Sequence, residues 1–372
     1  MTSPDVIVIG AGVIGCACAY ELAAAGARVS VFDVRAIGQG ASQASAGVLA
    51  PYIEGHETSA LRELGRRSLD LYDAFIERLT ARSERVLHYT RGGTLEVALD
   101  GMHATRLRDS AEALRRDHVV ARWLEPVELR RAEPLAAAGA LGGLLIEMHG
   151  FVAVPDLTNA LSAAAMQNGA QFALETRVLS IAPEPNGTLI VETDHGPSRA
   201  ADVVFAAGSW AGQVHISGVD PTPVRPVRGQ LLHLAWPTGQ SLRHVLWGTD
   251  CYIVPWSNGR VLVGATVEEA GFDERSTAGG VRDLLAAGCA LVPDLRDASF
   301  IEVRVGLRPA SPDDLPVVGR SGVIPGLVYA TGHYRNGVLL APLTAALVRN
   351  LIIDDGEDDA LDVLSPSRLG RL

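Results

Sequence analysis

Short apolar runs alternate with amphipathic segments along the chain, and the two patterns predict buried strands and surface helices. Residues 5–9 read DVIVI, an apolar β-branched run typical of a strand buried on both faces. Apolar residues recur at helical spacing over 59–82, with Arg and Glu between them, which predicts an amphipathic helix. The same criteria predict strands at 29–32, 93–99, 142–146, 150–154, 201–207 and 327–331, and helices at 105–116, 156–167 and 338–352. We therefore expect an α/β fold with a doubly wound, Rossmann-like sheet.

A glycine-rich turn directly follows the first predicted strand. The sequence GAGVIG at 10–15 precedes small, helix-compatible residues, and the next apolar strand ends at Asp33. Strand, glycine turn, helix, strand and terminal acid within about 30 residues are typical of a dinucleotide-binding βαβ unit. Gly10 permits the tight turn, Gly12 permits close approach to a pyrophosphate, and Gly15 lets the helix pack on the sheet. The carboxylate of Asp33 can accept hydrogen bonds from ribose hydroxyls and would repel a 2′-phosphate. The context favours a dinucleotide site over a chance glycine turn.

Three later loops are also suited to close approach of a ligand. Residues 38–51 read GQGASQASAGVLAP, whose small side chains and hydroxyls favour a loop along a pyrophosphate over a flexible linker. The strand at 201–207 ends in Gly208-Ser209-Trp210, and the strand at 327–331 leads into GHYRNG and an apolar helix. The N-terminus of that helix can place N–H groups beside an electron-rich ring edge. We expect these separated stretches to build one nucleotide domain.

The intervening sequence has the pattern of an antiparallel sheet. Apolar runs predict strands at 227–234, 251–256, 260–265 and 301–307, and Asn258-Gly259 is a strong signal for a two-residue hairpin turn. Such a sheet can form one wall of a substrate pocket. We expect a discontinuous nucleotide-binding domain of residues 1–55, 145–212 and 310–372, and a second, α+β substrate domain of residues 56–144 and 213–309.

The charged residues narrow the range of functions. All 32 basic side chains are Arg, and the 372 residues include no Lys. This excludes pyridoxal-phosphate and other Schiff-base chemistry, and also a Walker-type phosphate lysine. The formal net charge of −11 disfavours nucleic-acid binding. A carboxylate or phosphate that is bound by a cation in this protein must therefore be bound by Arg.

Cysteine usage and apolar runs bear on location. Cys16, Cys18, Cys251 and Cys289 form no CxxC pair, so a disulfide scaffold is not expected. The N-terminal MTSPDVIVIG lacks the basic and apolar regions of a secretory signal. The longest apolar run, near 338–348, is shorter than the roughly 20 residues of a membrane helix. We expect a cytoplasmic protein that holds no metal and binds no membrane.

Several motifs together carry a family resemblance. They are VIVIGAGVIG, ASQASAGVLAP, FAAGSWAG, CYIVP followed by GRVLVGAT, VGLRPASPDDLPVVG and ATGHYRNGVLLAP. In order and spacing they resemble the glycine oxidase group of the D-amino-acid-oxidase-like, FAD-dependent amine oxidoreductases, over nearly the whole chain. The resemblance implies a glutathione-reductase-type FAD-binding domain with non-covalent FAD. It also implies oxidation of glycine or a related small amine by O2, a homotetramer and, in some bacteria, supply of an imine for thiamine biosynthesis.

The resemblance also implies roles for individual residues near the substrate. Arg308 would clamp the substrate carboxylate, Tyr252 would hydrogen-bond to it, and Arg335 would lie beside the flavin and the pocket, so these three are the expected catalytic residues. Val48 stands where relatives have Met, and Asp250 where they can have His; Val48 is expected to contact substrate. From the residues alone, an Arg at a strand end next to Pro can bind a carboxylate bidentately. A structural ion pair, a core tyrosine and a surface arginine remain the alternative interpretations of the three side chains.

The residues expected to contact FAD come from the same motifs. The main chain of Val178 would lie on the adenine side, and backbone groups of 332 and 335–338 would stabilise negative charge on the reduced flavin. The full set is Gly10, Ala11, Gly12, Val13, Ile14, Gly15, Asp33, Ala41, Ser42, Ala46, Gly47, Val48, Val178, Ala207, Gly208, Trp210, Arg308, Gly332, His333, Arg335, Asn336, Gly337 and Val338.

The implied reaction is hydride transfer from the substrate Cα to flavin N5, which gives a 2-oxo acid, ammonia or an amine, and peroxide. A D-amino-acid dehydrogenase that passes electrons to a quinone is the main alternative. Sarcosine oxidases use a lysine that this chain lacks, and a flavin-dependent tRNA-modifying enzyme is disfavoured by the acidic charge. Retention of Arg308 and Tyr252 argues against an inactive FAD-binding scaffold.

Overall fold

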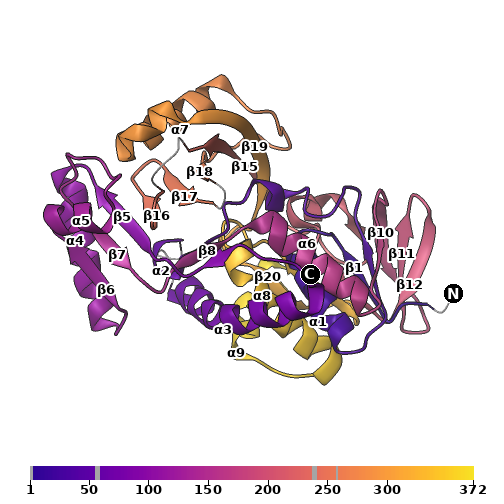
Figure 1. The fold of residues 1–372 in the computed structure, drawn as a ribbon. Coiled ribbons are helices and arrows are strands. Elements are labelled where there is room, and N and C mark those ends of the chain that lie inside the picture. The colour runs from indigo at the N-terminus through magenta and orange to yellow at the C-terminus, as the bar shows by residue number, and fades with distance from the viewer. Residues whose placement is uncertain (1–2, 55–58, 237–240, 257–258) are drawn as a thin grey trace.

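The first apolar run forms β1 (Val6–Ile9), which lies inside a six-stranded sheet (Figure 1). The computed structural model describes residues 3–54, 59–236, 241–256 and 259–372. The sheet contains, in order, β20 (Val317–Arg320), β21 (Leu327–Thr331), β13 (Asp202–Phe205), β1, β2 (Val29–Phe32) and β9 (Gln171–Ala173). Only β20 is antiparallel to its neighbour. The carboxyl ends of the parallel strands therefore meet at one edge, where ligands of such sheets bind.

The two faces of this sheet are covered by different layers. Side chains of β1 alternate, so that Val6 and Val8 pack into a helical core while Ile7 and Ile9 pack toward a second sheet. The helical layer contains α1 (Val13–Ala24), α3 (Ser59–Ser83), α6 (Val154–Gln167) and α8 (Gly337–Arg349). The second sheet contains β12 (Gly196–Ala200), β11 (Leu189–Thr193), β10 (Val178–Pro183) and β14 (His215–Ile216).

The predicted antiparallel strands form part of an eight-stranded sheet. Its order is β19 (Ser299–Ala310), β15 (Arg225–Ala235), β18 (Arg260–Gly264), β17 (Tyr252–Pro255), β16 (Val245–Trp247), β5 (Thr94–Ala98), β7 (Gly142–Ile146) and β6 (Ala121–Leu124). The longest pairing joins β15 and β19 and places Val227 opposite Arg308. The predicted turn residue Asn258 lies outside the described residues.

The remaining elements flank these sheets. A three-stranded sheet contains β3 (Val48–Leu49), β8 (Gly150–Val152) and β4 (Tyr89–Thr90). Further helices are α2 (Pro51–Glu54), α4 (Gly101–Arg116), α5 (Pro126–Ala132), α7 (Ala278–Leu291) and α9 (Asp359–Leu364).

Two segments pack against elements on the other side of the predicted domain division. Helix α3, expected in the second domain, buries Leu69, Tyr72 and Phe75 in the helical core of the first sheet. Its apolar stripe fits the gap beside α6 and α8, which local periodicity cannot show. Residues 145–146 were expected in the first domain but belong to β7, which pairs with β5 and β6. The predicted boundary at 55/56 lies outside the described residues.

The apolar segment Gly337–Asp354 has a composition that suits either a protein core or a membrane. Residues Gly337–Asp354 are apolar and long enough, by length and composition, to cross a membrane, so the apolar helix is longer than the run of 338–348 suggested. However, this window is 61% buried inside the protein, and α8 packs against α1 and α3. The apolar composition is therefore explained by core packing.

A buried hydrogen bond joins α3 to the start of α8. The Tyr72 side chain is fully buried, and its hydroxyl donates to the carbonyl of Val338 over 2.5 Å. Burial raises the pKa of Tyr72 well above its usual value, so the hydroxyl remains a donor.

We expect Tyr72→Phe to lower the free energy of unfolding by about 1 kcal/mol, because the Val338 carbonyl would lose its buried donor. Tyr89→Phe is the matched control. The Tyr89 ring is stacked on that of Tyr72, and its hydroxyl donates to Asp73 in a more exposed position. The control therefore removes the same atom from an exposed hydrogen bond. Denaturant unfolding of both variants measures the difference, and an equal loss in the two would contradict the role of burial.

Candidate active site

A cavity lies where the carboxyl ends of the first sheet face the eight-stranded sheet. Its walls come from the glycine turn after β1, the end of β2, the loop before β3, the loops after β13 and β21, and strands β17 and β19. The predicted site residues that line it are Gly10, Gly12, Val13, Ile14, Asp33, Ala41, Ser42, Ala46, Gly47, Val48, Val178, Ala207, Gly208, Trp210, Tyr252, Arg308, His333, Arg335, Gly337 and Val338. Tertiary folding thus brings together positions that are far apart in the chain.

Four predicted positions do not line this cavity: Ala11, Gly15, Gly332 and Asn336. Ala11 is fully buried, and Asn336 is buried at the N-terminus of α8. Gly15 packs against the glycine turn, since a Cβ there would lie 1.9 Å from the carbonyl oxygen of Gly10. All four are neighbours, in the chain, of residues that do line the cavity.

The glycine turn has the close backbone contacts that its sequence indicates. Gly10 has a φ of +109°, and a Cβ on it would lie 2.3 Å from the carbonyl oxygen of Ala206. The N-terminus of α1 faces the cavity with its positive dipole end, and the N–H of Val13, its first residue, donates to Ser42 over 3.0 Å.

Asp33 at the end of β2 is held by backbone donors. Its two carboxylate oxygens accept from the N–H of Ala11 at 2.6 Å and of Arg35 at 2.8 Å. Burial raises the pKa of the Asp33 carboxyl, and these backbone hydrogen bonds only partly offset that effect. Asp33 lines the cavity, and a carboxylate oxygen can accept a second hydrogen bond, as from a ribose hydroxyl.

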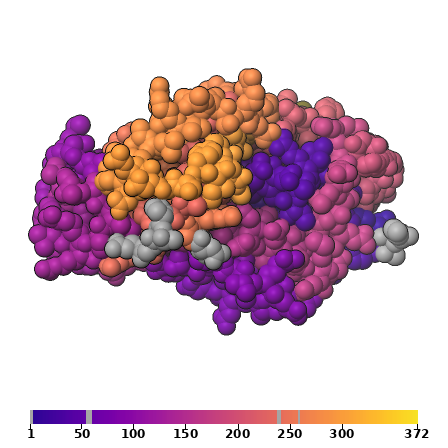
Figure 2. Space-filling model, turned by 45° about the horizontal axis from the view of Figure 1, so that its top comes forward, coloured from indigo at the N-terminus to yellow at the C-terminus, as the bar shows by residue number. Residues whose placement is uncertain are grey.

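Arg35 is a cavity residue that the sequence analysis did not single out. Its guanidinium lies 4.4 Å from the ring centroid of Trp210 and pairs with Glu274 through contacts of 2.9 and 2.7 Å. Figure 2 shows the indigo N-terminal segment bordering the orange segment of the chain, in agreement with this ion pair. The two-residue distance from Asp33 was the only sequence signal, because Glu274 is remote in the chain.

Arg308, Tyr252 and Arg335 also line the cavity. The Nη1 atom of Arg308 donates to the carbonyl of Thr266 at 2.9 Å and to that of Arg228 at 3.4 Å. The Tyr252 ring lies over the missing side chain of Gly264, where a Cβ would be 2.7 Å from the phenol oxygen. The Arg335 side chain is exposed and comes from the loop before α8.

The start of α8 and the residues before it form another part of the cavity wall. His333 is buried, and its Nε2 lies 3.0 Å from the hydroxyl oxygen of Thr344. Burial lowers the pKa of His333 to about 3, so its imidazole is neutral near pH 7. The helix dipole, and not a histidine cation, therefore supplies positive potential here.

The cavity fits a dinucleotide that is held without a covalent bond. The glycine turn and α1 offer N–H groups to a pyrophosphate, Asp33 lies where a ribose is expected, and α8 points its N-terminus at the opposite end. Among the described residues, no Cys lines the cavity. Burial raises the pKa of the Cys251 thiol to about 12, which leaves it protonated and unreactive.

No arrangement for a metal is found in the part of the chain that the structure describes, where groups of three or more His, Cys, Asp or Glu in ligand geometry are absent. A dinucleotide cradle at the carboxyl ends of a parallel sheet, facing an eight-stranded sheet that carries Tyr252 and Arg308, is typical of nucleotide-dependent oxidoreductases.

Comparisons with known proteins specify the family. Residues 5–351 match the family model described as FAD dependent oxidoreductase. The glycine oxidase of Geobacillus kaustophilus is 36% identical over 99% of this chain and 97% of its own length. Its crystal structure superposes with a TM-score of 0.93 at 34% identity and covers 99% of both chains. The chain therefore belongs to the FAD-dependent oxidoreductases and is a glycine oxidase-like, FAD-dependent amine or amino-acid oxidase.

Two other relatives extend the comparison. The iminodiacetate oxidase of Chelativorans sp. has a TM-score of 0.89 and 30% identity, with 97% of this chain and 98% of that one covered. The bifunctional protein ThiO/ThiG of Synechocystis is 34% identical over 99% of this chain, which spans 54% of that longer protein.

Purified protein is expected to be yellow and to release all of its FAD into the supernatant on acid precipitation, because the described lining offers no thiol for a covalent link. Absorbance of supernatant and pellet near 450 nm is the measurement. Flavin that stays with the washed pellet would show a covalent bond and contradict this reading of the cavity.

Proposed function

We propose that the protein oxidises glycine or a related small amine or D-amino acid, such as sarcosine, D-alanine or D-proline, with non-covalent FAD and with O2 as the final electron acceptor. The observation that carries the proposal is the Arg308 guanidinium, which lines the cavity together with Tyr252 and the first residues of α8. The similarity to glycine oxidases over nearly the whole chain supports the same substrate class.

Arg308 is suited to bind a substrate carboxylate. The carbonyls of Thr266 and Arg228 accept from this guanidinium and so help to orient it. A planar guanidinium can bind a carboxylate through two parallel hydrogen bonds. The Tyr252 hydroxyl can donate to the same carboxylate, and Arg335 adds positive potential from the loop before α8.

These contacts fix the position of the substrate Cα, which is the main task of the protein in this reaction. When bound, FAD supplies a hydride acceptor at N5 and passes the two electrons to O2, which yields peroxide. The positive charges of Arg308 and Arg335 in the lining disfavour a second positive charge, so the substrate amine is expected to bind without its extra proton. The imino acid product then hydrolyses in water to a 2-oxo acid and ammonia or an amine.

Three earlier expectations stay predictions. The homotetramer and the role in thiamine biosynthesis rest on the family resemblance, and the division of the chain into two discontinuous domains rests on sequence pattern. We keep a cytoplasmic location as a prediction as well.

Arg308→Ala should raise KM for glycine by roughly two to three orders of magnitude, since removing one partner of a buried charged pair costs about 3–5 kcal/mol. Arg225→Ala is the matched control, because Arg225 stands on β15, the strand beside β19, and forms an exposed ion pair with Glu269. Steady-state kinetics of both variants provide the test. A KM for Arg308→Ala equal to that of the wild type would remove Arg308 from the substrate site.

Under air, the enzyme should produce peroxide with at least one of glycine, sarcosine, D-alanine and D-proline. A coupled peroxidase assay across this panel identifies the preferred amine. Oxygen consumption should match peroxide formation one to one. Turnover that requires a dye or quinone and leaves oxygen unused would instead support a D-amino-acid dehydrogenase.

A further inference from the structure

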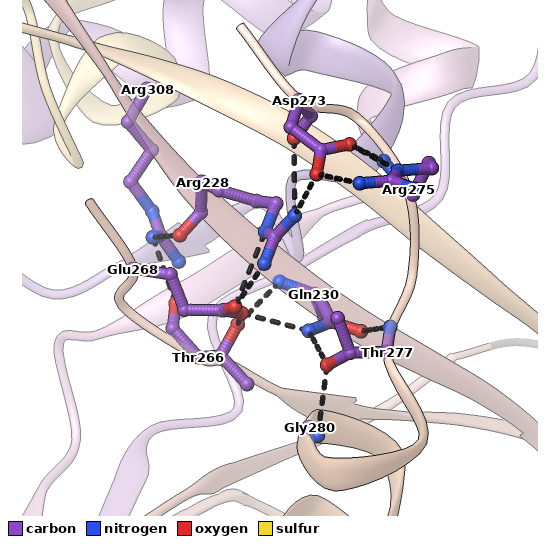
Figure 3. Close-up of polar contacts among 9 residues, drawn as sticks. All are labelled: Arg228, Gln230, Thr266, Glu268, Asp273, Arg275, Thr277, Gly280 and Arg308. Atoms are coloured by element: carbon purple, nitrogen blue, oxygen red, sulfur yellow. Dashed lines mark hydrogen bonds and ion pairs between the residues drawn. The ribbon is translucent and has the colours of Figure 1, made fainter. Parts of the chain in front are cut away.

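The loop between β18 and α7 connects both ends of the cavity. We call residues 266–277 the strap. At one end Glu274 pairs with Arg35, and the Phe272 ring lies 6.1 Å from that of Trp210. At the other end the carbonyl of Thr266 accepts from Arg308. Figure 3 shows this second end, where side chains from the strap and β15 converge below Arg308.

Glu268 is the centre of the polar network in the strap. One carboxylate oxygen accepts from Arg228 Nη2 at 2.5 Å and from its Nε at 3.2 Å. The other accepts from Gln230 Nε2 at 2.7 Å and from the Thr266 hydroxyl at 2.5 Å. The Gln230 and Arg228 side chains are buried. Three of these four hydrogen bonds, those from Arg228 and Gln230, join the strap to β15, and the fourth lies within the strap.

The carboxylate form of Glu268 is the stable one. Burial by itself would raise the pKa of Glu268, but the hydrogen bonds from Gln230, Thr266 and Arg228, together with the charge of Arg228, outweigh it and leave the pKa lowered. The network is therefore charged at neutral pH. Asp273 also pairs with Arg228, at 3.2 Å, so the guanidinium lies between two acids of the strap.

The same network sets the two acceptors of Arg308. Thr266 is held through its side chain, which donates to Glu268 and accepts from the N–H of Gln230 at 2.9 Å. The main chains of Arg228 and Glu268 exchange hydrogen bonds of 2.9 and 3.0 Å. Both carbonyls that accept from Arg308 therefore belong to residues fixed by Glu268.

The other constraint on Arg308 is the absence of a side chain at Gly229. A Cβ on Gly229 would lie 2.4 Å from Nη2 and 2.5 Å from Cζ of Arg308. The guanidinium thus lies directly on the backbone of β15. Because it is the mobile end of a long side chain, an added methyl group would displace it without disrupting the strand.

We propose that Glu268 is a positioning residue for Arg308 and that Gly229 provides the surface on which the guanidinium lies. This inference rests on the proposed function, in which Arg308 binds the substrate carboxylate. Glu268 acts through the carbonyls of Thr266 and Arg228 and does not itself contact the substrate.

The test compares Glu268→Gln with Glu269→Gln in the FAD-loaded enzyme. Both changes remove one negative charge from adjacent residues, but Glu269 forms only an exposed pair with Arg225. We expect Glu268→Gln to raise KM for the best amino-acid substrate about 10-fold or more, with a much smaller change in kcat, because charge-assisted hydrogen bonds that orient Arg308 are lost. Glu269→Gln should behave as the wild type.

Two binding measurements separate positioning from a general loss of structure. Acetate, a carboxylate probe, is titrated through the change that it causes in the flavin spectrum, and the FAD dissociation constant is measured by flavin fluorescence. Glu268→Gln should weaken acetate about as much as it raises KM and leave FAD affinity within about twofold. Weaker FAD binding or lower thermal stability with unchanged acetate affinity and KM would overturn the proposal.

Gly229→Ala displaces the Arg308 guanidinium directly, without changing Glu268, and so provides an independent test. It should raise KM and weaken acetate in the same way, with an unchanged unfolding temperature. Wild-type KM and acetate affinity in both Glu268→Gln and Gly229→Ala would reject the positioning role while Arg308→Ala still raised KM. An unchanged KM in Arg308→Ala would instead reject the proposed function itself.

Discussion

The orientation of the Arg308 guanidinium in the cavity depends on two paired strands of the eight-stranded sheet, β19 and β15. Arg308 stands on β19, directly over the backbone of β15 at Gly229. The long antiparallel pairing of these strands fixes their separation, so the guanidinium has a rigid surface beneath it. Neutral carbonyls direct it, and the acids of the strap balance Arg228, which lies behind it. The guanidinium of Arg308 is thereby held in place at the cavity wall.

Close backbone contact is the second constraint, because the two sheets must approach each other around a thin ligand. The short helical turn at Ala41–Ala44, in the loop before β3, crosses β19 at Gly306, where a Cβ would lie 2.9 Å from that of Ala44. The glycine turn after β1 likewise leaves no space for a side chain at Gly10. The strap then joins the two sides through Glu274 and Arg35. Small residues and ion pairs together bring the dinucleotide end and the arginine end into one cavity.

Much of the architecture was predictable because its signals are local. The βαβ unit at the N-terminus, the strand at 327–331 and the antiparallel strands around β15 and β19 were all identified from apolar periodicity and glycine placement. The family resemblance was confirmed by the match over residues 5–351. The contacts of α3 with α6 and α8 could not be predicted, because an amphipathic helix shows that it has a buried face but not which sheet that face contacts.

The sequence by itself determined the chemistry that was possible: a chain without lysine has to bind a carboxylate through arginine, and its glycine turn indicates a dinucleotide. Only the tertiary structure decided which arginines do what. Arg35 stacks on Trp210, Arg228 lies between acids, and Arg308 rests on a glycine, although all three are the same residue type. The reason is physical: a guanidinium takes its role from the groups that surround it, and those groups come from strands and loops far away in the chain.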